Sequence, residues 1–246
     1  MMRNSHSIKI FYLILAVSVL PLSCDFLFPG REDVNPDIGG VDQELFPLAV
    51  GNYWDYRTFY TRADTLRLEI LNEYELSFDG RVYKAFGFDR FPIIEGLIPS
   101  EREWLYAHSP RGLLAFGGKY HNEIALNNTL QFKYPGNSGD SWVLEDMAFD
   151  IETGKFTKDS DIVMYLLDTD APCSAQTIEM DGCYVYHYED ISTTDAVYHW
   201  YNYIHVKPGL GVISIETFDG PKGLITNPPI REIMRQDLIN YHINGQ

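Results

Sequence analysis

The side chains that could support catalysis in this sequence are few and widely spaced. Ser141, in the segment Gly139-Asp140-Ser141, would need a base to accept its proton and an acid to orient that base. The sequence places neither at a spacing that identifies it. His199 and His205 lie six residues apart, so both would project to the same side of an extended strand. No third metal ligand accompanies them, and we interpret them as ordinary sheet residues.

Four aspartates form two Asp-x-Asp pairs, a spacing that also occurs in calcium-binding loops. They are Asp159, Asp161, Asp168 and Asp170. The glycine and the terminal glutamate of such a loop are missing, so we expect solvated loop carboxylates. The sequence therefore predicts no catalytic residue, no metal site and no cofactor.

Two of the three cysteines lie close together in the second half of the chain. Cys173 and Cys183 are ten positions apart, on either side of Asp181-Gly182. In an oxidising compartment they could form a disulfide, and in a reducing one they would be two buried thiols. Their spacing is not that of a zinc site.

The N-terminus has the order of parts of a signal peptide. Arg3 and Lys9 precede an uncharged apolar run, residues 10–22, which ends at Ser23-Cys24. The run is shorter than the roughly 20 residues that cross a bilayer, which disfavours an uncleaved anchor. This arrangement resembles the lipobox of bacterial lipoproteins, which implies cleavage after residue 23 and lipidation of Cys24. The alternative is an ordinary secretory peptide with Cys24 as a free thiol.

Composition divides the rest of the chain into a tether and a globular part. Residues 24–43 are rich in Asp, Gly and Pro without a sustained period, which predicts a flexible tether after Cys24. Residues 44–246 form the expected folded domain. Removing residues 1–23 lowers the count of Lys and Arg from 19 to 17, against 35 Asp and Glu, a formal charge of −18. Nucleic acid is therefore an unfavourable partner, and we expect contact with the membrane through N-terminal acyl chains.

The folded domain has the sequence period of β-strands. Apolar and charged residues alternate over residues 65–70, and helical periods are scarce. Asp-Gly pairs at 79–80, 181–182 and 219–220 predict hairpin turns. The final apolar run, residues 234–243, fits either a helix or a closing strand, and we favour the strand.

A motif of the form PxxxG[N/D]xW occurs twice, 88 residues apart. The copies contain Pro47, Gly51, Asn52 and Trp54, then Pro135, Gly139, Asp140 and Trp142. Proline and glycine suit a turn, Asn or Asp can bond the nearby backbone, and Trp can begin a strand with its ring in the core. We therefore assign the motif a structural role.

Further landmarks follow each copy of the motif in the same order. An Asp-Gly pair comes first, then a tryptophan in an aromatic run (Trp104 or Trp200), then a Pro-Gly turn before aliphatic residues. This order predicts two similar β-meander halves, residues 45–125 and 130–246. We expect a mainly β fold with few helices, in which the halves form a curved antiparallel sheet or an open half-barrel.

Two segments carry a resemblance to known proteins. FPLAVGNYWDY (residues 46–56) and KPGLGVISIE (residues 207–216) resemble paired signatures of uncharacterised secreted bacterial lipoproteins. The expected architecture is more loosely similar to the open β half-barrels of LolA-like and LolB-like lipoprotein carriers. That likeness implies an apolar ligand in the concave face.

These observations favour a non-enzymatic envelope lipoprotein, exported and facing the periplasm or the cell surface. Its expected partners are an apolar small molecule or another protein. The aromatic runs around Trp104 and over residues 198–203 suggest an alternative, a carbohydrate-binding surface, although cross-strand aromatic pairing is their ordinary role. A cell-envelope hydrolase is the third reading, and it would require polar groups brought together from distant strands.

Overall fold

The computed structural model describes residues 20–21, 44–59, 65–92, 102–150, 152–175, 178–190, 198–221 and 231–244. Cys24, almost all of the expected signal peptide and the tether lie outside these ranges. Twelve long strands make up most of the described chain: β2 (Tyr53–Phe59), β3 (Thr65–Phe78), β4 (Arg81–Pro92), β5 (Arg102–Ser109), β6 (Gly112–Tyr120), β7 (Glu123–Lys133), β8 (Ser141–Asp150), β9 (Lys155–Ala175), β10 (Ile178–Asp190), β11 (Tyr198–Lys207), β12 (Gly211–Pro221) and β13 (Arg231–His242). A two-residue strand, β1 (Leu20–Pro21), pairs with β8.

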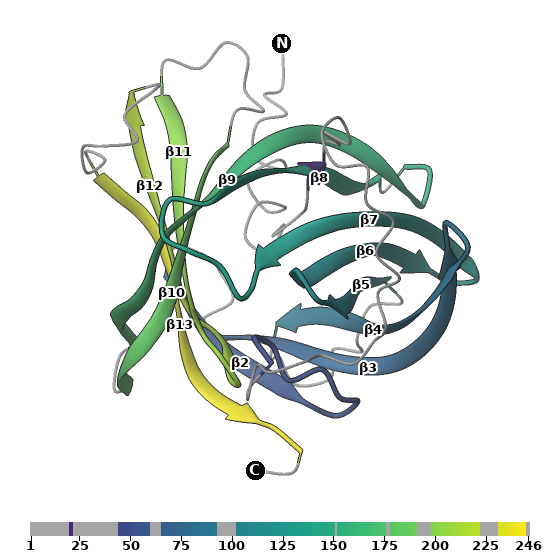
Figure 1. Cartoon of the computed structure of the whole chain (residues 1–246), viewed down its shortest axis with the longest axis horizontal. Coiled ribbons are helices and arrows are strands. Elements are labelled where there is room, and N and C mark those ends of the chain that lie inside the picture. Colours follow the sequence, from purple (N-terminus) through teal and green to yellow (C-terminus); the bar gives the residue numbers. More distant parts are fainter. Residues whose placement is uncertain are drawn as a thin grey trace, which may run out of the picture.

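The strands form one antiparallel sheet that curls into a nearly closed barrel (Figure 1). The order across the sheet is β1-β8-β9-β10-β11-β12-β13-β2-β3-β4-β5-β6-β7. Each of the twelve long strands therefore pairs with its neighbours in sequence, except that β13 pairs with β2 and no ladder joins β7 to β8. In Figure 1, β10 to β13 stand steeply on the left and β3 to β7 cross the right side of the molecule. The predicted β fold is confirmed, and the described residues contain no helix, hence none long enough to span a membrane.

Alternating residue types explain why the segments form strands. In β3 the apolar residues Leu66, Leu68 and Ile70 are buried, while Arg67 and Glu69 between them are partly exposed. Successive side chains of a strand point to opposite faces, so this pattern buries one face and hydrates the other. A register shift between Ile70 and Asn72 then changes which face the following residues occupy.

Six strands follow each copy of the PxxxG[N/D]xW motif, β2 to β7 after the first and β8 to β13 after the second. Trp54 and Trp142 lie at the start of the first strand of each set, and Trp104 and Trp200 lie in the fourth. The turns that contain Pro110 and Pro208 lie between the fourth and fifth strands, as predicted. The two sets of six strands meet at the paired junction β13–β2 and at the unpaired junction β7–β8.

The two motifs make the same backbone hydrogen bonds. The Gly51 amide donates to the carbonyl of Ile70 at 2.9 Å, and the Gly139 amide donates to that of Leu166 at 2.7 Å. The Ile70 amide in turn donates to the carbonyl of Asn52, and the Leu166 amide to that of Asp140. Both glycines have a positive φ, 89° and 93°, a region that disfavours residues with a Cβ.

Two of the three predicted Asp-Gly hairpin turns are wrong. Asp79-Gly80 does form the β3–β4 turn, with both residues at positive φ. Asp181-Gly182 instead lies inside β10, at a register shift next to Cys183, and Asp219-Gly220 lies inside β12. Asp219 has a ladder partner on each side, Trp200 and Arg231, which hold it in the sheet. Asp181 and Gly182 lie in an irregular stretch of β10, where the Lys207 ammonium donates hydrogen bonds to both of their carbonyls. The closing strand was predicted correctly, as β13.

The barrel interior holds the main hydrophobic core, and a smaller cluster lies on the opposite face of β4 to β7. The alternation is visible in β6, where Leu113 and Ala115 belong to the main core and Leu114 and Phe116 to the smaller cluster. The tip of the β3–β4 hairpin covers this outer cluster, with the rings of Phe78 and Tyr83 centred 6.0 and 4.6 Å from that of Phe116. The sheet is therefore buried on both faces in this region.

A disulfide joins β9 to β10, between Cys173 and Cys183. Both residues are buried in the main core, and their Cα atoms are 6.1 Å apart.

Candidate ligand-binding cavity

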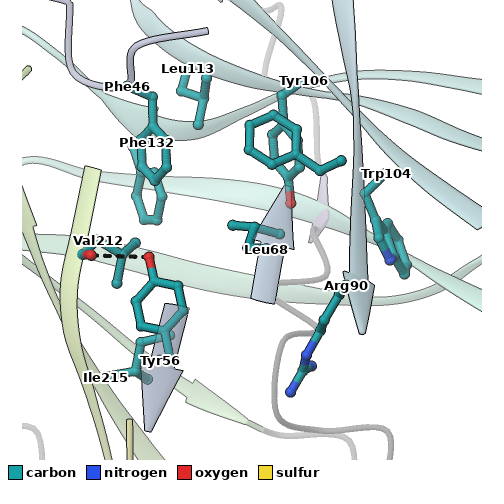
Figure 2. Close-up of a pocket in the computed structure, with 11 residues that line it drawn as sticks. Phe46, Tyr56, Leu68, Arg90, Trp104, Tyr106, Leu113, Phe132, Val212 and Ile215 are labelled. Carbon is teal, nitrogen blue, oxygen red and sulfur yellow. Dashed lines mark hydrogen bonds between the residues drawn. The ribbon is translucent and has the colours of Figure 1, made fainter. Parts of the chain in front are cut away.

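The barrel interior contains an apolar cavity. Its walls enclose about 580 Å³, a volume that includes the part open to solvent. The lining residues come from strands of both halves and from the segment that precedes β2: Phe46, Tyr56, Leu68, Phe88, Arg90, Trp104, Tyr106, Leu113, Phe132, Val212 and Ile215 (Figure 2). Like most ligand pockets in proteins, the cavity is mostly apolar with a few polar groups.

The segment before β2 closes one side of the cavity. Phe46 is buried, and its ring stacks on that of Phe132 with a centroid distance of 6.3 Å. The carbonyl of Glu44 accepts a hydrogen bond from the Gly209 amide, which ties this segment to the β11–β12 turn. Tyr56 fixes the neighbouring wall, because its hydroxyl donates to the carbonyl of Val212 at 3.1 Å (Figure 2).

Aromatic rings from β4 and β5 form the opposite wall. Phe88 and Tyr106 pack edge to face at 5.0 Å, and Trp104 packs edge to face on Phe156 at 4.9 Å. The ring of Trp104 therefore belongs to the interior wall. This placement disfavours the alternative of an exposed sugar-binding surface at this residue.

Arg90 is the charged residue in the cavity lining. It lies on β4 two positions after Phe88, so the two side chains share a face of the strand. Among the described residues, no carboxylate pairs with its guanidinium. Burial lowers the pKa of Arg90 to about 9, because desolvation disfavours the charged form. The group still carries its charge at neutral pH.

Two buried amides lie on the same side of the sheet as the cavity. Gln236 is the direct ladder partner of Ile215, and paired residues of an antiparallel ladder project to one face. Gln236 is fully buried, and neither of its amide atoms has a partner in the described structure. Asn202 accepts a hydrogen bond from the Thr217 hydroxyl at 2.8 Å, whereas its amide nitrogen has no partner.

A separate polar cluster surrounds Glu103 on the outer face of β5. Its carboxylate accepts hydrogen bonds from Asn72 and from the Tyr74 hydroxyl, and it pairs with Lys119 at 3.1 Å. Desolvation and the hydrogen bond to Glu103 raise the pKa of Tyr74. The carboxylate lies directly over Gly87, where a Cβ would be 1.9 Å from Oε2. Because these groups satisfy one another, we interpret the cluster as structural.

His187 is a buried histidine in an aromatic environment. Its ring lies 4.6 Å from that of Tyr203 and stacks parallel to that of Tyr201. Its Nδ1 lies 3.1 Å from the carbonyl of Asn202, to which it donates a hydrogen bond in the neutral form. Burial lowers the pKa of His187 to about 4 and the carbonyl partly opposes this effect, so the ring is neutral at pH 7.

The structure does not assemble the catalytic candidates of the sequence. Ser141 is exposed at the start of β8, and the adjacent Asp140 is paired with Lys133 and accepts a hydrogen bond from the Asn137 amide. His205 lies within β11, while the side chain of His199 lies outside the described residues.

The expectation that the four aspartates lie in loops is wrong. Asp159, Asp161, Asp168 and Asp170 all lie within the 21-residue strand β9, because β8 and β10 pair along its two edges. Asp161 pairs with Lys158 at 3.1 Å, and Asp168 accepts a hydrogen bond from the Asp170 amide. Within the described ranges, no three His, Cys, Asp or Glu side chains are grouped as a metal site.

Sequence reasoning did not identify Arg90 as a site residue. The sequence feature that could have indicated it is the segment Phe86-Gly-Phe88-Asp-Arg90. Its alternation places Arg90 on the same face of the strand as Phe86 and Phe88, which are buried. Alternation alone cannot show that this face lines a cavity.

Comparison with known proteins gives distant structural neighbours only. No protein family model matches the chain, and no curated protein matches it. A solved structure described as a "putative lipoprotein" from Parabacteroides distasonis has a TM-score of 0.43 and 11% identity. A "putative exported protein" with a YmcC-like fold from Bacteroides fragilis has a TM-score of 0.43 and 12% identity. Each match covers 81% of this chain and 99% of the other chain.

Proposed function

We propose that this chain is an exported, lipid-anchored envelope protein that binds an apolar small molecule inside its barrel, and that it is not an enzyme. The observation that carries this proposal is the cavity lined by aromatic and aliphatic side chains between the two halves. Side chains that line an unfilled apolar space lack dispersion contacts on that side, so binding of an apolar ligand would stabilise the folded barrel.

Two further features support export from the cytoplasm and attachment to a membrane. The disulfide between Cys173 and Cys183 suits an oxidising compartment, where such bonds persist. The N-terminal pattern that ends at Cys24 suits lipidation, and two or more acyl chains would give stable attachment.

Native mass spectrometry of the full chain with Cys24→Ser, exported and purified without detergent, tests the proposal. We expect a bound small molecule after purification, or after incubation with N-phenyl-1-naphthylamine, an uncharged apolar probe. Val212 lines the cavity, and its backbone carbonyl accepts the hydrogen bond from Tyr56. Val212→Phe would fill the cavity with the larger ring, so it should lower the fraction of protein with bound ligand about tenfold or more.

A matched control is Val82→Phe, at a position that is 70% exposed on the β3–β4 hairpin. It should leave binding unchanged. A wild-type chain that stays free of ligand after the probe is offered would overturn the proposal, and so would equal binding by the two valine variants.

A further inference from the structure

Arg90 places a positive charge in a wall that is otherwise apolar or aromatic. Figure 2 shows its side chain below Trp104, with the guanidinium directed away from Trp104, Leu113 and Phe132. Its neighbours in the cavity lining contribute no carboxylate. Other partly exposed arginines of the sheet are paired, as Arg67 is with Asp55 at 2.7 Å and Arg235 with Glu216 at 2.7 Å.

Arg90 is partly buried, and no carboxylate of the described residues pairs with it. A charge in such a setting opposes folding, because it loses part of its hydration without a compensating ion pair from those residues. The lowered pKa of Arg90 has the same cause. A bound anion would remove this cost in the liganded state. A guanidinium is well suited to that role, since it can donate two parallel hydrogen bonds to a carboxylate, sulfonate or phosphate.

The rest of the cavity limits the shape of such an anion. Phe88, Tyr106 and Phe132 offer ring surfaces, and Leu68 and Ile215 offer aliphatic ones. A ligand with several charges would leave the others unpaired against these walls. The cavity therefore fits one charged head and an apolar body. The unpartnered amide of Gln236, beside Ile215, could donate a further hydrogen bond to a polar atom of the ligand.

We propose that the ligand is an apolar monoanion, with its carboxylate, sulfonate or phosphate head bound by Arg90 and its apolar body held among the aromatic residues of the cavity. This inference rests on the proposed binding function and adds the chemical class of the ligand.

Two fluorescent probes of similar shape and different charge test the inference. They are 1-anilinonaphthalene-8-sulfonate, which is anionic, and N-phenyl-1-naphthylamine, which is uncharged. In the Cys24→Ser chain, Arg90→Gln should weaken binding of the anionic probe by about 10- to 100-fold, the range expected for a charge-assisted hydrogen bond. It should change the affinity for the uncharged probe by less than about threefold. Arg90→Lys, which keeps the charge without the planar fork, should fall in between.

Arg111→Gln is the matched control. Arg111 is exposed in the β5–β6 turn, so this substitution removes the same charge from the surface of the protein. It should leave both affinities unchanged. Equal losses for the two probes in Arg90→Gln, or no loss for either, would overturn the inference while the proposed function stands. If neither probe binds the wild-type chain, the proposed function itself fails.

A measurement on the wild-type chain covers the case in which Arg90→Gln does not fold. Decanoate and 1-decanol share a chain length and differ in charge. Decanoate should displace the uncharged probe at a concentration at least about tenfold lower than 1-decanol, and the reverse order would overturn the inference.

Discussion

At the scale of single residues, Trp54 and Trp142 occupy the same position in the two copies of the PxxxG[N/D]xW motif but differ in burial. The Trp54 indole donates to the carbonyl of Leu210 at 2.6 Å, and the Trp142 indole donates to that of Leu130 at 2.8 Å. Trp54 is completely buried, whereas Trp142 is partly exposed. Equivalent motif positions should therefore contribute differently to stability.

Replacing each tryptophan with phenylalanine measures that difference. Trp54→Phe leaves a buried carbonyl without its donor and a cavity in the core, so it should lower the free energy of unfolding by about 2–4 kcal/mol. Trp142→Phe should cost about 1–2 kcal/mol, because water can reach the carbonyl it leaves. Urea denaturation gives both values, and equal losses would contradict the assigned difference in burial.

His187 predicts a specific dependence of stability on pH. Its pKa is about 4 in the folded protein and 6.5 for an ordinary histidine. Between these values the unfolded chain binds a proton that the folded chain does not, so stability falls as the pH decreases from 6.5 to 4. The shift corresponds to about 3 kcal/mol over that window.

The test compares denaturation at pH 7 and pH 4.5 for the wild type and for His187→Gln. The variant should lose less stability on acidification, while His242→Gln, at an exposed position, should behave as the wild type does. An identical pH slope in the wild type and His187→Gln would exclude the buried neutral histidine as the cause.

At the scale of elements, the close contact between β4 and β5 depends on a missing side chain. Gly87 leaves space for the carboxylate of Glu103, which in turn binds Asn72, Tyr74 and Lys119. A strand glycine normally weakens a sheet, and here it allows a buried polar group to reach its partners. One position therefore decides whether this polar cluster can form.

Gly87→Ala should lower the free energy of unfolding by about 3 kcal/mol, because the new methyl group would displace the buried carboxylate. Gly80→Ala is the comparison, since its Cβ would meet nothing within 4 Å and only the positive φ of 74° disfavours it. That substitution should cost about 1 kcal/mol. In a Glu103→Ala background the cost of Gly87→Ala should shrink, and full additivity in this double-mutant cycle would contradict the proposed contact.

At the scale of the whole molecule, the two junctions between the halves differ. β13 and β2 share a ladder with one register shift, after Leu238. β7 and β8 are instead held by side-chain hydrogen bonds to backbone carbonyls, from Trp142 to Leu130 and from Asn127 to Glu145. An edge without a ladder has fewer backbone bonds to break on opening. The barrel should therefore open first between β7 and β8.

Amide hydrogen exchange tests this order. Amides of β2 and β13 should exchange more slowly than the outward-directed amides of β7 and β8. Trp142→Phe should raise exchange in β7 and β8 and leave β13 unchanged. Uniform protection around the barrel would show that the β7–β8 junction is as stable as a paired one.

The sequence by itself determined the local features of this protein. Alternation over residues 65–70 predicted a strand, the last apolar run predicted the closing strand, and the paired motifs predicted the starts of β2 and β8. These features depend on residues close together in the chain, because strand period and turn preference are local. The signal peptide and the lipidation of Cys24 remain predictions.

Only the tertiary structure decided which of these local features form a site. Asp181-Gly182 and Asp219-Gly220 have the residues of a turn, yet both lie inside long strands because of contacts with distant residues, Lys207 for the first pair and Trp200 and Arg231 for the second. Arg90 follows a pattern that any half-buried strand could show. Its place in a cavity depends on Phe46, Phe132 and Val212, which come from distant segments. The partial burial of Arg90, and a cavity lining that offers it no carboxylate, are properties of those long-range contacts, so alternation along one strand could not predict them.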